Sequence, residues 1–250
     1  MTIDDFLDSL TEHIVARHTY LHHPFFTLLH QGKITRDQLK GWAKQYSVIP
    51  KSHLINNAGK VAHAQLIRGG PFEQLLESPY DLEITKLLGD AIMDELGHTE
   101  ISPANHWEPY LDFTDELGIP REQMENPDDL LPASLVTLHA WTESAKNFPL
   151  VDLIGSHNFV NDPANVRGFP RVCESFKKYY GLSDKATYWF ALHGEVDKEH
   201  GSMARAILKK YVKTEADRQR LKYAVTFGLG VFWTLHDGVV AAYVNHTYKV

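Results

Sequence analysis

Cysteine is almost absent from this chain. Cys173 is the only one in 250 residues, so no internal disulfide can form, which is typical of a reducing compartment. A basic surplus is also missing, because 25 Lys and Arg face 32 Asp and Glu and the net charge is −7. Nucleic acid and anionic membranes are therefore poor partners. The N-terminus, MTIDDFLDSL, is acidic and lacks a signal-peptide pattern, so we expect a cytoplasmic protein.

A long uninterrupted hydrophobic run is missing as well. The most apolar stretch covers residues 223–244, and His236 and Asp237 lie near its middle. Ionisable residues are costly at the centre of a bilayer, so we expect a buried core helix and no membrane span. The same apolar helix could provide the interface of a homodimer.

Alternation of apolar and polar residues with a period of two is not sustained anywhere, which argues against a sheet. Capping and turn signals instead predict one all-α domain over residues 1–250, a bundle of roughly eight helices. The longer predicted helices cover residues 35–63, 80–98, 132–146, 149–161, 166–180, 184–211 and 215–248.

Histidine is abundant, with 15 residues, and it is the commonest metal ligand in proteins. The segment His193-Gly-Glu-Val-Asp197-Lys-Glu-His200 places two imidazoles and a carboxylate on one helical face over two turns. This set could form half of an iron site. A solvent-exposed, charged helix would show the same sequence pattern, but Trp189 and Phe190 just upstream favour a buried helix.

A second cluster lies earlier in the chain. Glu95 and His98 form the Glu-x-x-His pair found in di-iron helical bundles, and His106 follows shortly afterwards. The pair alone is weak evidence, because it also occurs by chance in amphipathic helices. An exposed helix end near Gly97 is the competing interpretation.

These motifs together resemble the heme-oxygenase-like di-iron oxidases. The chain is more distantly similar to pyrroloquinoline-quinone synthase and the thiaminase-II group, which belong to the same superfamily. The resemblance covers most of the chain. The helix with His193, Asp197 and His200 is its most specific part, and the opening segment identifies only the wider superfamily. The other matching segments are His23-Pro24-Phe25-Phe26, Gly32 to Leu39, Met93-Asp94-Glu95, Asn105-His106, Leu117-Gly118 and Tyr180-Gly181.

The resemblance implies a heme-oxygenase-like fold and a six-residue ligand set. Glu95 matches the first carboxylate. His106 matches the histidine better than His98, because its downstream context aligns without a gap. The last carboxylate falls on Asp162, where the family has glutamate, and Glu143 is the weaker alternative. The implied metal ligands are Glu95, His106, Asp162, His193, Asp197 and His200.

The resemblance also implies an oxidase or oxygenase with two Fe(II) ions per chain, O2 as co-substrate and an external electron donor. A chlamydial branch of the family consumes its own tyrosine and lysine. This chain has other residues at the matching places, so we expect an external small-molecule substrate, such as an amino acid, an amine or a fatty acid. The differing places are Phe26, Trp42, Asn161, Val172 and Trp189. The aromatic residues expected to shape the substrate pocket are Phe25, Phe26, Trp42, Tyr46 and Trp189.

Three other functions stay open at the level of sequence. A metal-free enzyme on the same fold would resemble pyrroloquinoline-quinone synthase or thiaminase II. A mononuclear or manganese site is favoured by the shorter side chain of Asp162. A protein-interaction module without catalysis would use an exposed helical face.

Overall fold

Helices joined by short turns account for the whole of the described chain, and no strand occurs in that part. The computed structural model describes residues 1–64, 81–98 and 105–247, except the side chains of residues 196 and 198–200. The all-α, single-domain prediction is confirmed. The helices are α1 (Ile3–Val15), α2 (Thr19–His22), α3 (Pro24–His30), α4 (Arg36–Tyr46), α5 (Val48–His63), α7 (Leu82–Glu95), α8 (Trp107–Leu117), α9 (Arg121–Glu125), α10 (Pro132–Asn147), α11 (Leu150–Ser156), α12 (Asn158–Tyr180), α13 (Asp184–Tyr211) and α14 (Glu215–Val239).

Side-chain caps set the start of several of these helices. Thr35 and Gln38 form the predicted capping box of α4, in which each side chain accepts a hydrogen bond from the other residue's backbone N–H. Ser183 caps α13, and Thr214 with Asp217 caps α14 in the same way. These caps satisfy N–H groups that the first turn of a helix leaves unpaired.

Two predicted helix boundaries are wrong. The predicted helix over residues 35–63 is two helices, because the chain turns at Ser47 and Pro50 cannot donate the backbone hydrogen bond to Tyr46. The predicted break between residues 161 and 166 does not exist, since α12 continues through Pro163. The chain instead breaks at His157, whose φ of −107° and ψ of −85° are not helical.

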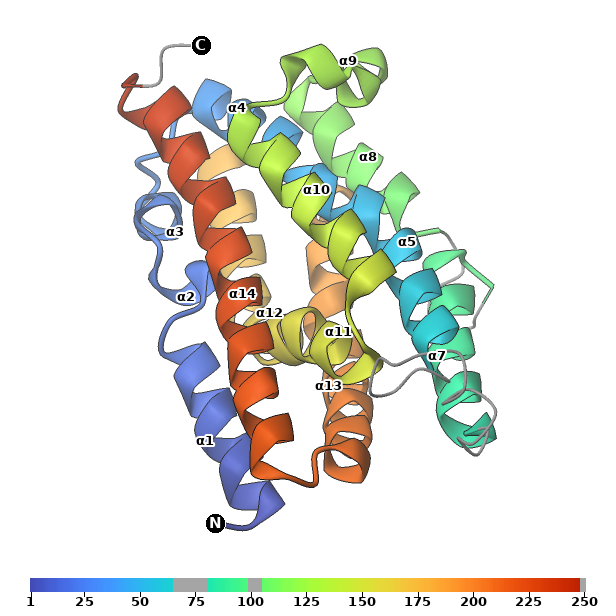
Figure 1. Ribbon diagram of the computed structural model, residues 1–250. Coiled ribbons are helices and arrows are strands. Elements are labelled where there is room, and N and C mark those ends of the chain that lie inside the picture. Colours follow the sequence, from blue (N-terminus) through green and yellow to red (C-terminus); the bar gives the residue numbers. More distant parts are fainter. Residues whose placement is uncertain (65–80, 99–104, 248–250) are drawn as a thin grey trace.

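The centre of the bundle is the pair α12 and α13, which share the most extensive helix contact of the described chain. The short helix α11 runs crosswise in Figure 1 and contacts α12, α13 and α14. Helices α5 and α10 pack against each other, and α7 lies against α5 at the edge of the molecule. Four separate segments of the chain, α5, α7, α12 and α13, therefore surround one interior region.

The apolar C-terminal helix runs beside α1 and α10 in Figure 1. Residues Glu215–Val244, which are α14 and a π-helical turn (Val240–Val244), are long and apolar enough to cross a membrane by length and composition alone. In this structure 56% of their most apolar stretch is buried, and α14 packs against α10 and α11. These contacts are those of a core helix, which is what the sequence predicts for this segment.

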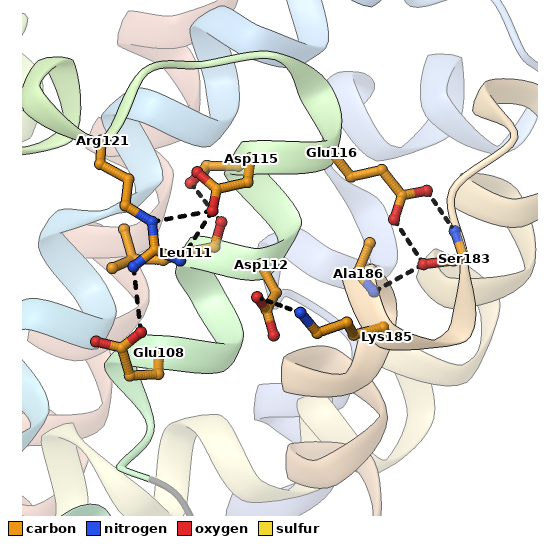
Figure 2. A network of polar contacts seen from close by, with 10 residues as sticks. Glu108, Leu111, Asp112, Asp115, Glu116, Arg121, Ser183, Lys185 and Ala186 are labelled. Atoms are coloured by element: carbon orange, nitrogen blue, oxygen red, sulfur yellow. Dashed lines mark hydrogen bonds and ion pairs between the residues drawn. The ribbon is translucent and has the colours of Figure 1, made fainter.

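A surface network joins α8 to the start of α13 (Figure 2). The carboxylate of Glu116 accepts hydrogen bonds from the backbone N–H of Ser183, at 2.8 Å, and from its hydroxyl. Lys185 lies 2.9 Å from Asp112, and the guanidinium of Arg121 pairs with Asp115. The network is exposed, so it adds little stability to the direct packing of α8 against α13.

Candidate metal centre

The first two site residues come from α13. Because α13 is one continuous helix, His193 and Asp197, four residues apart, lie on the same face, and both are buried. The Nδ1 atom of His193 lies 2.8 Å from the carbonyl oxygen of Trp189. A hydrogen on Nδ1 then donates to that carbonyl, which leaves Nε2 with a lone pair for a metal. Burial lowers the pKa of His193 to about 4, so the imidazole stays neutral near pH 7.

Glu95 is the last residue of α7 and lies between two imidazoles. Its Oε2 is 2.9 Å from Nδ1 of His106, and its Oε1 is 3.5 Å from Nδ1 of His53. Burial alone would raise the pKa of Glu95, but His53 and His106 outweigh this effect and hold the pKa well below its usual value. His106 is buried at the start of α8, where its backbone N–H donates to the carbonyl of Glu95.

Four side chains thus converge from four helices. One ligand atom from each of His53, Glu95, His106 and His193 lies within 4.8 Å of the other three. The ring of His193 is 4.9 Å from that of His106 and 5.7 Å from that of His53. His53 was not predicted as a ligand from the sequence. It is the only residue of α5 in the cluster, and no local spacing links it to the other three.

Two aspartates extend this cluster along α12 and α13. Asp162 is buried on α12, and a Cβ placed at Gly201 of α13 would lie 3.4 Å from the Cβ of Asp162. Asp197 accepts a hydrogen bond of 2.7 Å from Nδ2 of Asn165, one turn after Asp162. A cavity of about 60 Å³ is lined by both aspartates and by His53, Glu95 and His193.

The other residues considered as ligands lie in different surroundings. His98 is exposed beyond the end of α7 and is not in the cluster, whereas His106 is. Glu143 of α10 is half-exposed, pairs with Lys146 at 2.7 Å and does not line the cavity. His200 belongs to α13, but its side chain lies outside the described part of the structure.

The aromatic residues predicted to shape the pocket form the core beside it. Phe25 stacks on Trp42 at 5.4 Å, Trp42 stacks on Tyr46 at 4.8 Å, and all are almost fully buried, as is Phe26. The described lining of the cavity includes none of them, since their rings pack on one another and leave no space for a ligand. Trp189 comes nearest to the site, with its ring 4.2 Å from that of His193.

The donor set fits a first-row transition metal. Imidazole nitrogens and carboxylate oxygens are the ligands that non-heme iron prefers, and here they converge at a place where His106 and His193 are buried and His53 and Glu95 are half-buried. The backbone carbonyl behind His193 and the amide behind Asp197 fix the direction of two of these donors. The arrangement can therefore hold a metal.

Comparison with known proteins identifies the family. The model of the iron-containing redox enzyme family matches residues 75–229, which covers α7 to most of α14, and the chain belongs to this family. A pyrroloquinoline-quinone synthase of Xanthomonas campestris is 26% identical over 245 residues, which is 96% of this chain and 89% of that protein. The 4-aminobenzoate synthase of Chlamydia trachomatis is 26% identical over 86% of this chain and 84% of that protein.

Solved structures show the same fold at lower identity. A CADD-like protein of Nostoc punctiforme has a TM-score of 0.71 at 14% identity and covers 95% of this chain and 98% of its own. A TenA homologue of Pseudomonas syringae has a TM-score of 0.69 at 13% identity and covers 95% and 90% of the two chains. A domain with a heme oxygenase-like fold from Shewanella denitrificans has a TM-score of 0.64 at 16% identity and covers 99% of this chain and 94% of its own. The predicted heme-oxygenase-like fold is confirmed.

Proposed function

We propose that this chain is an iron-dependent oxidase or oxygenase that uses O2 on an external small molecule through a non-heme di-iron centre. The observation that supports this most is the convergence of His53, His106 and His193 on Glu95, with ligand atoms within 4.8 Å of one another. Asp162 and Asp197 line the same cavity and offer the oxygen donors that a second iron needs.

The chain's own residues prepare this centre in three ways. The carbonyl of Trp189 orients His193, and the amide of Asn165 orients Asp197, so neither donor has to reorganise when it binds a metal. The packed aromatic core beside His193 keeps water out on that side. Bound iron would supply the binding and reduction of O2, which no amino-acid side chain supplies.

Two further parts of the proposal come from the sequence and its family. Full reduction of O2 takes more electrons than a simple oxidation of the substrate delivers, so we include an external electron donor. A cytoplasmic location and a homodimer stay predictions from the sequence.

The test is a count of bound iron. The protein is purified without chelators, loaded anaerobically with Fe(II), freed of excess metal and analysed for iron per chain. We expect about two irons for the wild-type chain, the number that bundle carboxylate centres hold. We expect His193→Ala to lose most of this iron, because a donor inside the cluster is missing. His98→Ala serves as the control, since His98 is exposed outside the cluster.

The other results each lead to a different conclusion. About one iron per chain, unchanged by Asp162→Ala, would replace the di-iron centre with a mononuclear one. Loss of iron in His98→Ala but not in His106→Ala would mean that His98, and not His106, is the ligand. No specific iron in the wild-type chain would overturn the proposal and favour a metal-free enzyme on this fold.

A further inference from the structure

A buried lysine faces the candidate metal centre. Lys60 of α5 is only 4% exposed and lines the cavity together with Asp162 and Asp197. Its ammonium donates to Oδ1 of Asn57 at 2.7 Å, and Nδ2 of Asn57 points to Glu95 at 3.5 Å. The bond to Asn57 is the only hydrogen bond of the Lys60 ammonium within the described part of the chain. An ammonium has three donors. Two donors of a buried cation are therefore left for a ligand.

The charges around Lys60 point to the sign of that ligand. Burial lowers the pKa of Lys60 to about 8, and the nearby Asp162, Glu95 and Asp197 keep it from falling further, so the amine is mostly charged at neutral pH. Without metal, the three carboxylates more than balance this cation. With two Fe(II) ions bound, the positive charges in the cavity outweigh the three carboxylates. A buried excess of positive charge is costly, and an anionic group from the substrate would remove it.

Hydrogen-bond acceptors line the same cavity. The side-chain oxygens of Asn56 and Asn165 are buried and have no hydrogen-bond partner within the described residues. The orientation of the Asn165 amide is set by the hydrogen bond from its Nδ2 to Asp197. Asn56 and Asn165 are 5% and 8% exposed, so these oxygens cannot reach bulk solvent. A buried carbonyl oxygen of this kind is a good partner for an amine N–H.

We propose that this cavity binds the head group of an amino acid, with the carboxylate on Lys60 and the amine towards the oxygens of Asn56 and Asn165. The inference deepens the proposed function and rests on it, because bound iron supplies the positive charge that favours an anionic group and because the amine then lies beside the metal centre. A fatty acid fits less well, because it has no N–H group to donate to the unpartnered oxygens of Asn56 and Asn165.

The space available agrees with a head group whose side chain extends outward. The cavity of about 60 Å³ has the volume of about two water molecules in the liquid, so it can take a small head group but not a whole side chain. Two larger clefts adjoin it and share its carboxylates. One of about 470 Å³ is lined by Glu95, and one of about 420 Å³ is lined by Asp162 and Asp197. Either cleft could take the substrate side chain.

The test measures which part of a ligand Lys60 recognises. The twenty proteinogenic L-amino acids are screened by thermal shift and calorimetry against the Fe(II)-loaded chain under anaerobic conditions and against the metal-free chain. The best amino acid is then compared with the amine that lacks its carboxylate. We expect wild type to prefer the amino acid at least tenfold, and Lys60→Met to lose this preference while it still binds the amine. Lys60→Arg, which keeps the cation, should recover part of the preference.

Two results would overturn the inference. One is that none of the twenty amino acids binds to either form of the wild-type chain. The other is that Lys60→Met weakens amino acid and amine equally, which would make Lys60 only a counter-charge for the three carboxylates. Failure of the proposed function is seen separately, in the iron count. A chain that binds no iron but loses its carboxylate preference in Lys60→Met would still support the head-group site.

Discussion

Buried histidines in this chain lie in two kinds of surroundings. His18 is fully buried against the rings of Tyr20 and Phe232, whereas His106 lies 2.9 Å from the carboxylate of Glu95. An aromatic surrounding disfavours the charged imidazolium. Burial accordingly lowers the pKa of His18 to about 3 and lowers the pKa of His236, its neighbour in the aromatic core, well below its usual value. Histidines of the core must therefore be neutral for the chain to fold.

We expect this to appear as a loss of stability in mild acid. The folded pKa of His18 lies below the usual value of 6.5, so the unfolded chain takes up the proton first as the pH falls. The stabilisation is complete above about pH 6.5 and decreases towards the folded pKa, by about 1.4 kcal/mol per pH unit for each such histidine. The free energy of unfolding of the metal-free chain, measured by urea denaturation between pH 7.5 and 5, should fall with pH.

The variant His18→Asn isolates one of these histidines. Nδ1 of His18 caps α2 by accepting from the backbone N–H of Tyr20, and an asparagine oxygen can do the same without titrating. The free energy of unfolding of this variant should fall less steeply with decreasing pH than that of wild type, by the contribution of one histidine. Curves of equal slope would show that His18 is not the titrating group.

At the scale of helices, the close approach of α14 to α11 depends on a glycine. A Cβ placed at Gly228 would lie 2.3 Å from the carbonyl oxygen of Ser156, the last residue of α11, and real Cβ atoms do not come so close. Gly230, two residues later on the same helix, has no atom within 4 Å of such a Cβ. Two glycines on one helix therefore have opposite roles, one required by packing and one not.

The two positions give a matched pair of variants. Gly228→Ala should destabilise the chain by about 1–3 kcal/mol, because α11 and α14 must move apart. Gly230→Ala should stabilise it by up to about 1 kcal/mol, since alanine is the better helix former and meets no neighbour. Both free energies of unfolding come from chemical denaturation. Equal effects at the two positions would mean that α14 does not approach Ser156 of α11 as closely at Gly228 as this structure shows.

Helix boundaries show how far local sequence signals reach. The starts of α4, α13 and α14 follow from Thr35, Ser183 and Thr214, because a cap is a contact within four residues. The break at His157 could not be predicted in this way. His157 is buried, its Nε2 lies 3.0 Å from Ser144 Oγ, and its ring packs on Trp141, so residues of another helix hold it in place. Tertiary contacts also let α12 continue through Pro163, where local propensity predicts a stop.

The same distinction holds for the site at the scale of the whole molecule. His193 and Asp197 could be predicted because their spacing of four residues matches about one turn of a helix. Glu95 and His106 needed the resemblance to a family, since they lie on α7 and at the start of α8. His53 needed the structure, because only the packing of α5 against α7 brings it within 3.5 Å of Glu95. A cluster whose members come from separate helices leaves no local pattern in the sequence.

This origin of the cluster predicts how metal changes global stability. A metal that binds His53, Glu95, His106 and His193 joins α5, α7, α8 and α13, and it binds only the folded chain. Free Fe(II) at about 100-fold its Kd should add about 2.7 kcal/mol and raise Tm by roughly 5–10 °C, measured anaerobically by calorimetry. His53→Ala should lose most of the rise and His98→Ala should keep it. A rise that His53→Ala leaves intact would place the metal away from α5.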